Sequence, residues 1–497
     1  MNVRAALALL ALSAFAPGAS AASSAPTRGA TVTPRPAVSE ADSSAHFTYA
    51  SLRPADRAFV DTLEARTFHY FWDLTDPRTG LTPDRAPTRS FSSVAAVGFA
   101  LTAYPIGAER GWITRQQALE RTRATLRFFW TSRQDTARAG ATGYRGFYYH
   151  FLNPHDGTRF QDVELSSIDT ALLLAGALFS EQYFDRASAG EAEVRALAES
   201  LYRRVDWSWM SVRPPKIALG WEPEDGPLPY DAGGYDETAI MYLLALGSPT
   251  HPLGATTWEQ RTKDYTWAAF EGESQVNFGP LFGHQYSHAW VDFRGITDAW
   301  MRAKGIDYFE NSRRATLAQR RYASVNPGRF DDYGPLVWGL TACDGPLDGR
   351  VEIGGRSRAF HTYTARGACA NGIVDDGTIA PAAVAGSMPF VPELVLPTLE
   401  HLATAYGRDL DSTYGFLDAF NPTLKGGADV HHGRIVPGKG WFDTDWLGID
   451  EGPILLMIEN WRSGLVWSRM RRCPHLVHGL EVAGFEGGWL ERARTTR

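Results

Sequence analysis

Cysteine is scarce in this chain. Only three of its 497 residues are cysteines, which is too few for a scaffold stapled by disulfides. Cys343 and Cys369 lie in adjoining glycine-rich segments, and we expect them to bridge a loop in an oxidising compartment. Cys473 is expected to be buried and free.

Signatures of bound metals are also missing. The sequence has no CxxC, HExxH or EF-hand pattern, and its thirteen histidines are scattered apart from the pairs His284/His288 and His431–His432. A metal site built on such a pair needs further ligands. The sequence therefore predicts neither a metal ion nor a cofactor.

Long apolar runs are confined to the first residues. The basic start, Met1–Arg4, is followed by an apolar stretch over Ala5–Phe15 that is too short to cross a bilayer, and then by small residues ending at Ala21. This pattern indicates a secretory signal peptide over residues 1–21. We therefore expect a periplasmic or secreted protein that does not insert into a membrane.

The chain has no strong excess of either charge. Its formal net charge is -7, and loss of the signal peptide, which carries Arg4 and no acid, makes it -8. A modest acidic excess argues against nucleic acid or an anionic membrane as a partner. Aromatic residues make up 12% of the chain. They can fill a core or form stacking platforms for sugars, and their number does not separate these uses.

The chain divides into a linker and one long domain. Residues 22–55 are rich in Ala, Ser, Thr and Pro and indicate a flexible linker. No further linker interrupts residues 56–497, so we expect a single domain there. Apolar periodicity predicts helices over 56–73, 91–104, 114–131, 167–185, 189–207, 235–247, 255–270, 288–303, 306–323, 378–387, 391–406 and 450–463. Strand-like alternation is confined to short pieces such as Ile217–Trp221 and Arg434–Val436.

The predicted helices are of two kinds. Some, such as Leu172–Leu178 and Ala239–Ala245, are apolar nearly all round, whereas others, such as Gln116–Phe129 and Glu191–Arg203, are amphipathic and charged. An inner ring of buried helices inside an outer ring of amphipathic helices accounts for both kinds. The sequence thus predicts an all-α, (α/α)6 toroid whose long loops form a cleft at one end.

Carboxylates stand at the start of several buried helices. Asp169, Glu237 and Asp450 each lie where a predicted apolar helix begins. A carboxylate in the first turn is favoured by the helix dipole and by free backbone N–H groups, so each acid can be only a helix cap. Three such starts meeting at one cavity would instead supply the paired carboxylates that glycoside hydrolysis needs.

Two aromatic loops have the composition of sugar-binding sites. Residues 283–294 and 441–446 combine rings with amide, imidazole, carboxylate and guanidinium groups. Rings bind the C–H faces of sugars and the polar groups bind hydroxyls, although a structural Arg–Asp salt bridge is the alternative in the first loop. The candidate binding residues are Tyr149, His284, Gln285, Tyr286, His288, Trp290, Arg294, Trp441 and Trp446.

Six ordered motifs carry a resemblance to a known family. They are Phe68–Trp72, Ser92–Gly98, Gly146–Phe151, Ser166–Leu173, Phe282–His288 and Gly448–Pro453. Over residues 56–485 the chain resembles the glucoamylase-like domain family, whose characterised members are bacterial endo-β-1,2-glucanases. The resemblance implies an (α/α)6 barrel and inverting, endo-acting hydrolysis of β-1,2-glucan, with the glucan as the partner and a monomeric chain.

The resemblance also implies that the acids in these motifs line the cleft. Glu237 is our candidate for the general acid, because a partly desolvated glutamate is easily raised in pKa toward the working pH. Asp169 and Asp450 compete for the role of general base. Three further acids are expected to bind substrate, namely Glu164, Asp236 and Asp376.

Other functions fit the same sequence less well. An exo-acting, sophorose-releasing hydrolase or a β-1,2-glucan transglycosylase would use the same scaffold. A toroidal polysaccharide lyase is disfavoured because an acidic cleft repels an anionic substrate. A non-catalytic glycan-binding protein is disfavoured because binding alone does not require several perturbed carboxylates.

Overall fold

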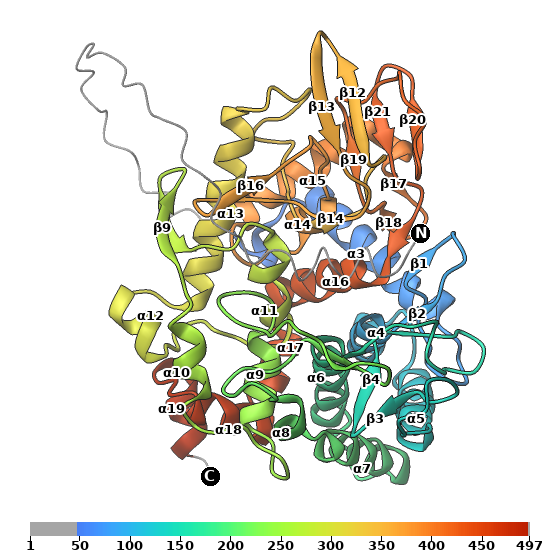
Figure 1. The fold of residues 1–497 in the computed structure, drawn as a ribbon, viewed down its shortest axis with the longest axis vertical. Helices are drawn as coiled ribbons and strands as arrows, with labels where there is room; N and C mark the ends of the chain where they lie inside the picture. The colour runs from blue at the N-terminus through green and yellow to red at the C-terminus, as the bar shows by residue number, and fades with distance from the viewer. Residues whose placement is uncertain (1–46, 496–497) are drawn as a thin grey trace.

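The computed structural model describes residues 47–495 and is rich in helices, with small sheets between them (Figure 1). The predicted signal peptide and residues 22–46 of the predicted linker lie outside the described residues. The rest of that linker is folded: Tyr49–Ser51 form the 3-10 helix η1, and Phe47 and Tyr49 pack against Trp461. The predicted start of the domain at Asp56 is therefore wrong, because the rings of Phe47 and Tyr49 already pack on the folded domain at Trp461. Within residues 47–495, no helix combines the length and the apolar character needed to span a bilayer.

Most predicted helices are present. The largely buried ones are α4 (Val94–Arg110), α6 (Ser167–Tyr183), α9 (Ala239–Leu246), α11 (Tyr286–Trp290), α14 (Pro381–Ala385) and α16 (Gly448–Arg462). Those with one buried face are α3 (Pro54–Leu74), α5 (Arg115–Thr131), α7 (Ala189–Arg204), α13 (Tyr308–Val325) and α15 (Pro392–Tyr406). The shorter ones are α8 (Trp207–Met210), α10 (Thr257–Thr262), α12 (Ala299–Lys304), α17 (Leu465–Met470), α18 (Pro474–Val482), α19 (Gly488–Thr495), η2 (Leu281–His284) and η3 (Gly407–Asp409).

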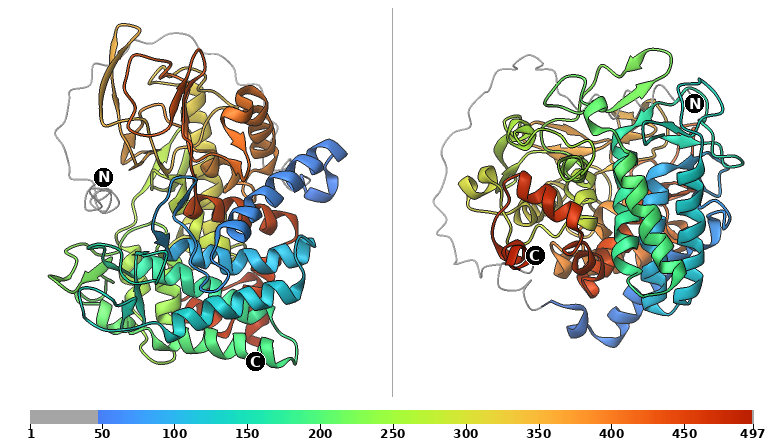
Figure 2. Two further views of the ribbon diagram at one scale, coloured as in Figure 1. Left: turned by 90° about the vertical axis from the view of Figure 1, so that its right-hand side faces the viewer. Right: turned by 90° about the horizontal axis from the view of Figure 1, so that it is seen from below.

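The buried helices pack on one another, and the one-sided helices cover them. α4 contacts α6 and α16, α6 contacts α9, α11 contacts both α9 and α16, and α14 contacts α16. On the outside, α3 and α5 cover α4, α7 covers α6, α18 covers α9 and α15 covers α14 (Figures 1 and 2). The contact between α4 and α6 is close because two glycines meet. A Cβ on Gly98 would lie 2.3 Å from the Leu172 carbonyl oxygen, and one on Gly176 would lie 2.1 Å from the Gly98 carbonyl oxygen.

Hydroxyl side chains fix where several helices begin. The Ser93 and Ser166 side chains accept hydrogen bonds from the third backbone N–H of α4 and α6 respectively, and Thr114 forms a capping box with Gln117. Such caps satisfy N–H groups that have no partner inside the helix. The caps place the first turns of α4 and α6 beside each other at the point where short strands lead into both helices.

Two predicted helices are wrong in extent. The helix predicted over 255–270 ends at Thr262, and Trp267–Phe270 instead form strand β9. The helix predicted over 288–303 is broken between α11 and α12 by residues 291–298. Apolar periodicity missed both because short amphipathic strands and turns share its spacing over a few residues. It also missed α17, α18 and α19.

The strands are short and form sheets of two to five members. The largest sheet has the order β3-β4-β6-β7-β8, with strands Gly143–Tyr144, Phe147–Tyr149, Leu165–Ser166, Gly220–Glu222 and Gly226–Pro227. A three-stranded sheet has the order β19-β21-β20, with strands Phe420–Asn421, Gly440–Phe442 and Arg434–Val436. The two-stranded pairs join β1 (Arg85–Ala86) to β22 (Trp446–Leu447), β2 (Ser92–Ser93) to β5 (Phe151–Leu152), β9 to β10 (Glu273–Val276), β11 (Ala342–Cys343) to β14 (Thr364–Ala365), β12 (Gly349–Ile353) to β13 (Arg356–Phe360), β15 (Gly367–Cys369) to β16 (Gly372–Val374), and β17 (Asp411–Ser412) to β18 (Gly415–Phe416). The predicted strand over Arg434–Val436 is β20, whereas Ile217–Trp221 overlaps only the start of β7.

The predicted disulfide is wrong. Cys343, Cys369 and Cys473 are all free and buried. The Cys343 sulfur lies 3.4 Å from the Arg366 guanidinium, which donates to it. Cys369 is the last residue of strand β15, which pairs with β16 in a different hairpin. Adjacency in a glycine-rich sequence did not indicate that the two residues belong to separate two-stranded sheets.

Candidate active site

One cavity of about 1450 Å³ collects side chains from segments far apart in the sequence. Its walls come from the loop between β1 and β2, the turn after β5, the first turn of α6 and the loop after β7. The lining is completed by Glu237, which lies two residues before α9, by the start of α11 and by residues around β22. Residues at or just before the starts of α6, α9, α11 and α16 therefore line this cavity.

Glu237 reaches the cavity from the start of α9. Its backbone carbonyl accepts a hydrogen bond from the Ser287 hydroxyl at 2.8 Å, which ties the start of α9 to α11. Burial, followed by repulsion from Asp236, raises the pKa of the Glu237 carboxyl to about 8. A carboxyl group that is still protonated at neutral pH can give a proton to a leaving group, as the prediction for Glu237 requires.

A histidine joins two acids at the start of α6. His150 Nδ1 lies 2.9 Å from Glu164 Oε1, and its Nε2 lies 3.6 Å from Asp169 Oδ1. Burial alone would lower the pKa of His150, but the charges of Asp169 and Glu164 outweigh burial and raise that pKa to about 9. The imidazole is therefore a cation at neutral pH. Ser166 donates its hydroxyl to Asp169, and all four side chains line the cavity.

Asp450 lies behind the cavity wall and is 4% exposed. Its Oδ2 is buried without a hydrogen-bond partner. Burial, opposed by a hydrogen bond with Asp418 and reinforced by repulsion from Asp344, raises the pKa of Asp450 to about 7. Burial and then the charge of Asp450 raise the pKa values of Tyr286 and Tyr363, two tyrosines of the wall, so the carboxylate lies close to both phenols.

Acids surround Arg85 on the side of the cavity next to β22. Arg85 donates to Asp344 at 2.5 Å and to Asp84 at 3.2 Å. Burial lowers the pKa of Arg85, but the charges of Asp344 and Asp84 outweigh it, so Arg85 stays charged. Asp84, Arg85 and His432 line the cavity although the sequence did not single out Asp84 or Arg85. Neither follows a helix start, which was the signal used to choose the acids.

Three phenylalanines form an apolar face in the cavity. The ring centroids of Phe91 and Phe151 are 3.9 Å apart, and those of Phe91 and Phe160 are 5.0 Å apart. All three line the cavity. Aromatic faces of this kind suit the C–H faces of a sugar. The sequence did not indicate these three residues, because a phenylalanine that lines a cavity has the same residue type as one that fills the core.

Most of the predicted binding loop over 283–294 does not reach the cavity. Tyr286 lines it, but the other predicted residues of the loop make contacts elsewhere. His284 contacts the Phe278 carbonyl, Gln285 donates to Ala383 and Ser387, and His288 contacts Ser312. Trp290 donates to Thr102, and Arg294 is held by Asp292, the salt bridge left open as the alternative. These five side chains do not line the cavity. His288 and Trp290 lie in the buried helix α11, whereas His284 and Gln285 precede it and Arg294 follows it.

Five further predicted residues hold the structure around the cavity instead of lining it. The Asp236 carboxylate pairs with Arg261 at 2.7 Å, and Asp376 pairs with the buried Arg366 at 2.8 Å. Tyr149 is buried beneath the Arg159 guanidinium. Trp441 donates to the His432 carbonyl and Trp446 to the Gly415 carbonyl. The polar groups of Asp236, Asp376, Trp441 and Trp446 have partners within the protein, whereas the buried Tyr149 hydroxyl has none. None of the five lines the cavity, whereas Glu164 does.

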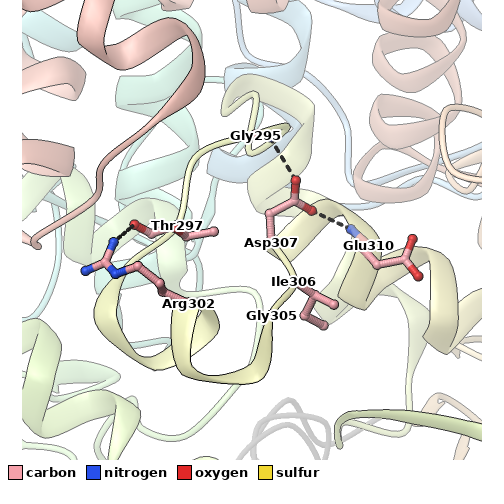
Figure 3. A pocket seen from close by; sticks show the side chains of 7 residues that line it. All are labelled: Gly295, Thr297, Arg302, Gly305, Ile306, Asp307 and Glu310. Atoms are coloured by element: carbon pink, nitrogen blue, oxygen red, sulfur yellow. Dashed lines mark hydrogen bonds between the residues drawn. The ribbon is translucent and has the colours of Figure 1, made fainter.

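A second, smaller depression lies between α12 and α13 (Figure 3). Asp307 accepts backbone hydrogen bonds from Gly295 and Glu310 there, and Arg302 donates to the Thr297 carbonyl. The Asp307 contacts are those of a helix cap, and they leave little to recognise a ligand. The large cavity is the candidate active site.

Comparisons with known proteins identify the family of this chain. The Glycoamylase family model, described as "Putative glucoamylase", matches residues 229–474, which include Glu237 and Asp450. A crystal structure of a "putative glucoamylase" from Bacteroides fragilis NCTC 9343 is 30% identical, with a TM-score of 0.75, and the match covers 88% of this chain and 99% of that one. This chain belongs to the glucoamylase-like family.

Two other relatives of this glucoamylase-like protein carry more specific names. A structure of an endo-beta-1,2-glucanase from Chitinophaga pinensis with sophorotriose and glucose is 27% identical, with a TM-score of 0.73, and the match covers 88% of this chain and 100% of that one. An exo beta-1,2-glucooligosaccharide sophorohydrolase of Parabacteroides distasonis is 26% identical over 482 residues. The match takes in 90% of this chain but spans only 60% of the length of that relative.

Proposed function

We propose that this protein is a glycoside hydrolase that cleaves β-1,2-linked glucans inside the chain and inverts the anomeric centre. The observation that supports it most is the Glu237 carboxyl, which faces a large cavity with its pKa raised to about 8. The linkage rests on the two relatives whose names specify β-1,2-glucans.

Glu237 acts as the general acid in this proposal. It gives its proton to the glycosidic oxygen while the bond from that oxygen to C1 breaks, so the leaving sugar departs as a neutral alcohol. Repulsion from Asp236 helps to keep the proton on Glu237 until that step. The Asp236 carboxylate pairs with Arg261, so it is not assigned a role in binding the substrate.

Asp450 is the better of the two candidates for the general base. A base is most effective when its pKa lies near the working pH, and the pKa of Asp450 is about 7 with one oxygen unpaired. Asp169 lines the cavity, but its carboxylate is already engaged by the Ser166 hydroxyl and the His150 cation. Asp450 takes the proton through Tyr286 or Tyr363, which line the cavity: the phenol gives its proton to Asp450 and receives one from the attacking water.

Inversion requires room for a water molecule between the acid and the base. Carboxyl groups about 6.5–9.5 Å apart leave that room. Both Glu237 and Asp450 contribute to the raised pKa of Tyr286, so this tyrosine lies near both carboxyl groups. The α anomer as the first product, detected by proton NMR, is the expected result for a β-linked substrate.

The helix contacts support the predicted toroid. The buried helices form a continuous series in which α4, α6, α9, α11 and α16 contact in turn and α16 returns to α4, with α14 on α16. We propose that this series is the inner ring of an (α/α)6 toroid in one catalytic domain, with the cavity at one end. The basic and then apolar sequence of residues 1–21, predicted to be a signal peptide, supports the proposal that the chain is exported to the periplasm or the medium.

Exo action is the second candidate, and the sophorohydrolase name of the Parabacteroides relative favours it. The test is to incubate the protein with linear β-1,2-, β-1,3- and β-1,4-glucans and to follow the products by chromatography. Endo action gives a ladder of oligosaccharides from the first minutes, whereas exo action gives sophorose alone. Cleavage of another linkage, or of none, would contradict the proposal.

A further inference from the structure

Four side chains from three separate segments meet beside the cavity. His432 Nε2 lies 2.7 Å from Asp443 Oδ1, 3.5 Å from Asp344 Oδ2 and 3.5 Å from Asp445 Oδ2. Asp344 follows β11, His432 lies in the loop before β20, and the two other aspartates stand between β21 and β22. The backbone of the histidine is fixed by Trp441, which donates to its carbonyl at 2.7 Å.

Some polar atoms of these side chains have no hydrogen-bond partner, although Asp344 Oδ2 accepts from Arg85 and Asp443 Oδ1 accepts from the backbone N–H groups of Thr444 and Asp445. The side chains of Asp443 and Asp445 are 0% exposed, yet Oδ2 of each has no hydrogen-bond partner. His432 Nε2 is buried and also lacks a properly directed hydrogen bond, despite its short distance to Asp443. Buried polar atoms without partners are costly, and clusters of them require a compensating group.

We propose that Asp344, His432 and Asp443 bind one divalent metal ion, with Asp445 as an adjacent carboxylate. One ligand atom from each of the three lies within 4.8 Å of the other two. Ligands at about 2.1 Å from a metal lie about 3.0 Å apart at right angles and about 3.4 Å apart in a tetrahedron. His432 Nε2 lies 2.7 Å from the Asp443 oxygen and 3.5 Å from the Asp344 oxygen, which is close to this range.

The charges of the neighbourhood also require a cation. Asp344, Asp443 and Asp445 are three buried acids, and Arg85 is the nearby cation, bonded to Asp344 and 4.0 Å from Asp445 Oδ2. Because Arg85 is shared with Asp84, a divalent ion would supply further positive charge to this group of carboxylates. It would also hold together the ends of β11, β21 and β22, which form one wall of the cavity.

The donor set selects the kind of metal. Imidazole favours zinc and other first-row transition ions, and carboxylates also accept manganese, whereas calcium prefers a shell made only of oxygen. One imidazole with two carboxylates therefore fits Zn²⁺ or Mn²⁺ better than Ca²⁺. The sequence could not indicate this set, because Asp344 stands far from His432 and no motif links them.

The test uses the untagged, full-length chain after removal of bound metal with EDTA. Isothermal titration with Zn²⁺ and with Mn²⁺ should show one site per chain, and each ion should raise the melting temperature. Co²⁺ should give visible absorption bands of an ion bound by nitrogen and oxygen. The variants Asp344→Asn, Asp443→Asn and His432→Gln should each weaken binding at least tenfold.

The matched control is Asp409→Asn. Asp409 also has two basic partners in the same region, Arg434 and Lys439, but it lies on the surface, so its loss should leave metal binding unchanged. Absence of a site for Zn²⁺ and Mn²⁺ in the native chain would overturn the proposal. The proposal would also be overturned if the three variants bound the metal as tightly as the native chain. Tighter binding of Ca²⁺ than of Zn²⁺ and Mn²⁺ would overturn it too. Because the readouts do not involve glycan cleavage, the result is independent of the proposed reaction.

Discussion

His150 Nε2 lies 3.6 Å from Asp169 Oδ1, across the first turn of α6. The same ring contacts Glu164 at 2.9 Å, so one cation separates two buried carboxylates at the edge of the candidate site. Without it, the two buried carboxyl groups would lie near each other with no positive charge between them. We infer that the His150 cation holds Glu164 and Asp169 in position at this edge of the site.

We therefore expect His150→Gln to lower kcat/KM on β-1,2-glucan by at least tenfold. The amide keeps much of the shape but carries no charge, so Glu164 and Asp169 lose their shared partner. The control is His155→Gln, because His155 lines the same cavity but is exposed. Equal activity of the two variants would remove His150 from the site.

The charge of His150 also gives a sign to the pH dependence of stability. Its pKa is raised from 6.5 to about 9, so its contribution to the free energy of unfolding is fully present below about pH 6.5. That contribution is lost as the pH rises through about 9. We expect the difference in melting temperature between the native protein and His150→Gln to shrink from pH 6 to pH 10, measured by calorimetry. A difference that grows with pH would contradict the ion-pair assignment.

Replacing Glu237 tests the general acid. Glu237→Gln keeps the size of the side chain but removes the transferable proton, and general acid help is worth about 10²–10⁴-fold. We expect kcat to fall by that factor while the fold persists. If instead Glu237 served only as a helix cap, stability would fall by about 1 kcal/mol and turnover would remain. Circular dichroism and initial rates on β-1,2-glucan separate the two cases.

The sequence predicted the positions of the buried helices better than the use of the polar side chains. Ser166 before Asp169, and the apolar run after Glu237, were sufficient to indicate where α6 and α9 begin, because capping and periodicity are local. His284 and Gln285 were assigned wrongly because residue type does not show which way a short buried helix turns its side chains. The cluster of Asp344 and His432 was invisible because only tertiary folding brings those residues together.

Tight packing against α4 holds α6 in position, and the first turn of α6 lines the candidate site. A Cβ at Gly98 would lie 2.3 Å from the backbone oxygen of Leu172, which cannot move without shifting α6. We expect Gly98→Ala to lower the free energy of unfolding by about 1–3 kcal/mol, as overpacking does. Gly254→Ala is the control, since nothing lies within 4 Å of its added Cβ. Urea unfolding of both variants measures the difference, and equal stabilities would contradict the close contact.

The choice between Asp450 and Asp169 as the base leads to the last prediction. Asp450→Asn removes the unpaired oxygen behind Tyr286 and Tyr363, so we expect kcat to fall by about 10²–10⁴-fold. Asp169→Asn weakens an ion pair but leaves that oxygen in place, and it should cost less. A small anion such as azide can replace a missing base because it attacks without giving up a proton. Azide should therefore restore part of the activity of Asp450→Asn and yield a glycosyl azide, whereas Asp169→Asn should not respond. Rescue of Asp169→Asn, with Asp450→Asn near native turnover, would assign the base to Asp169.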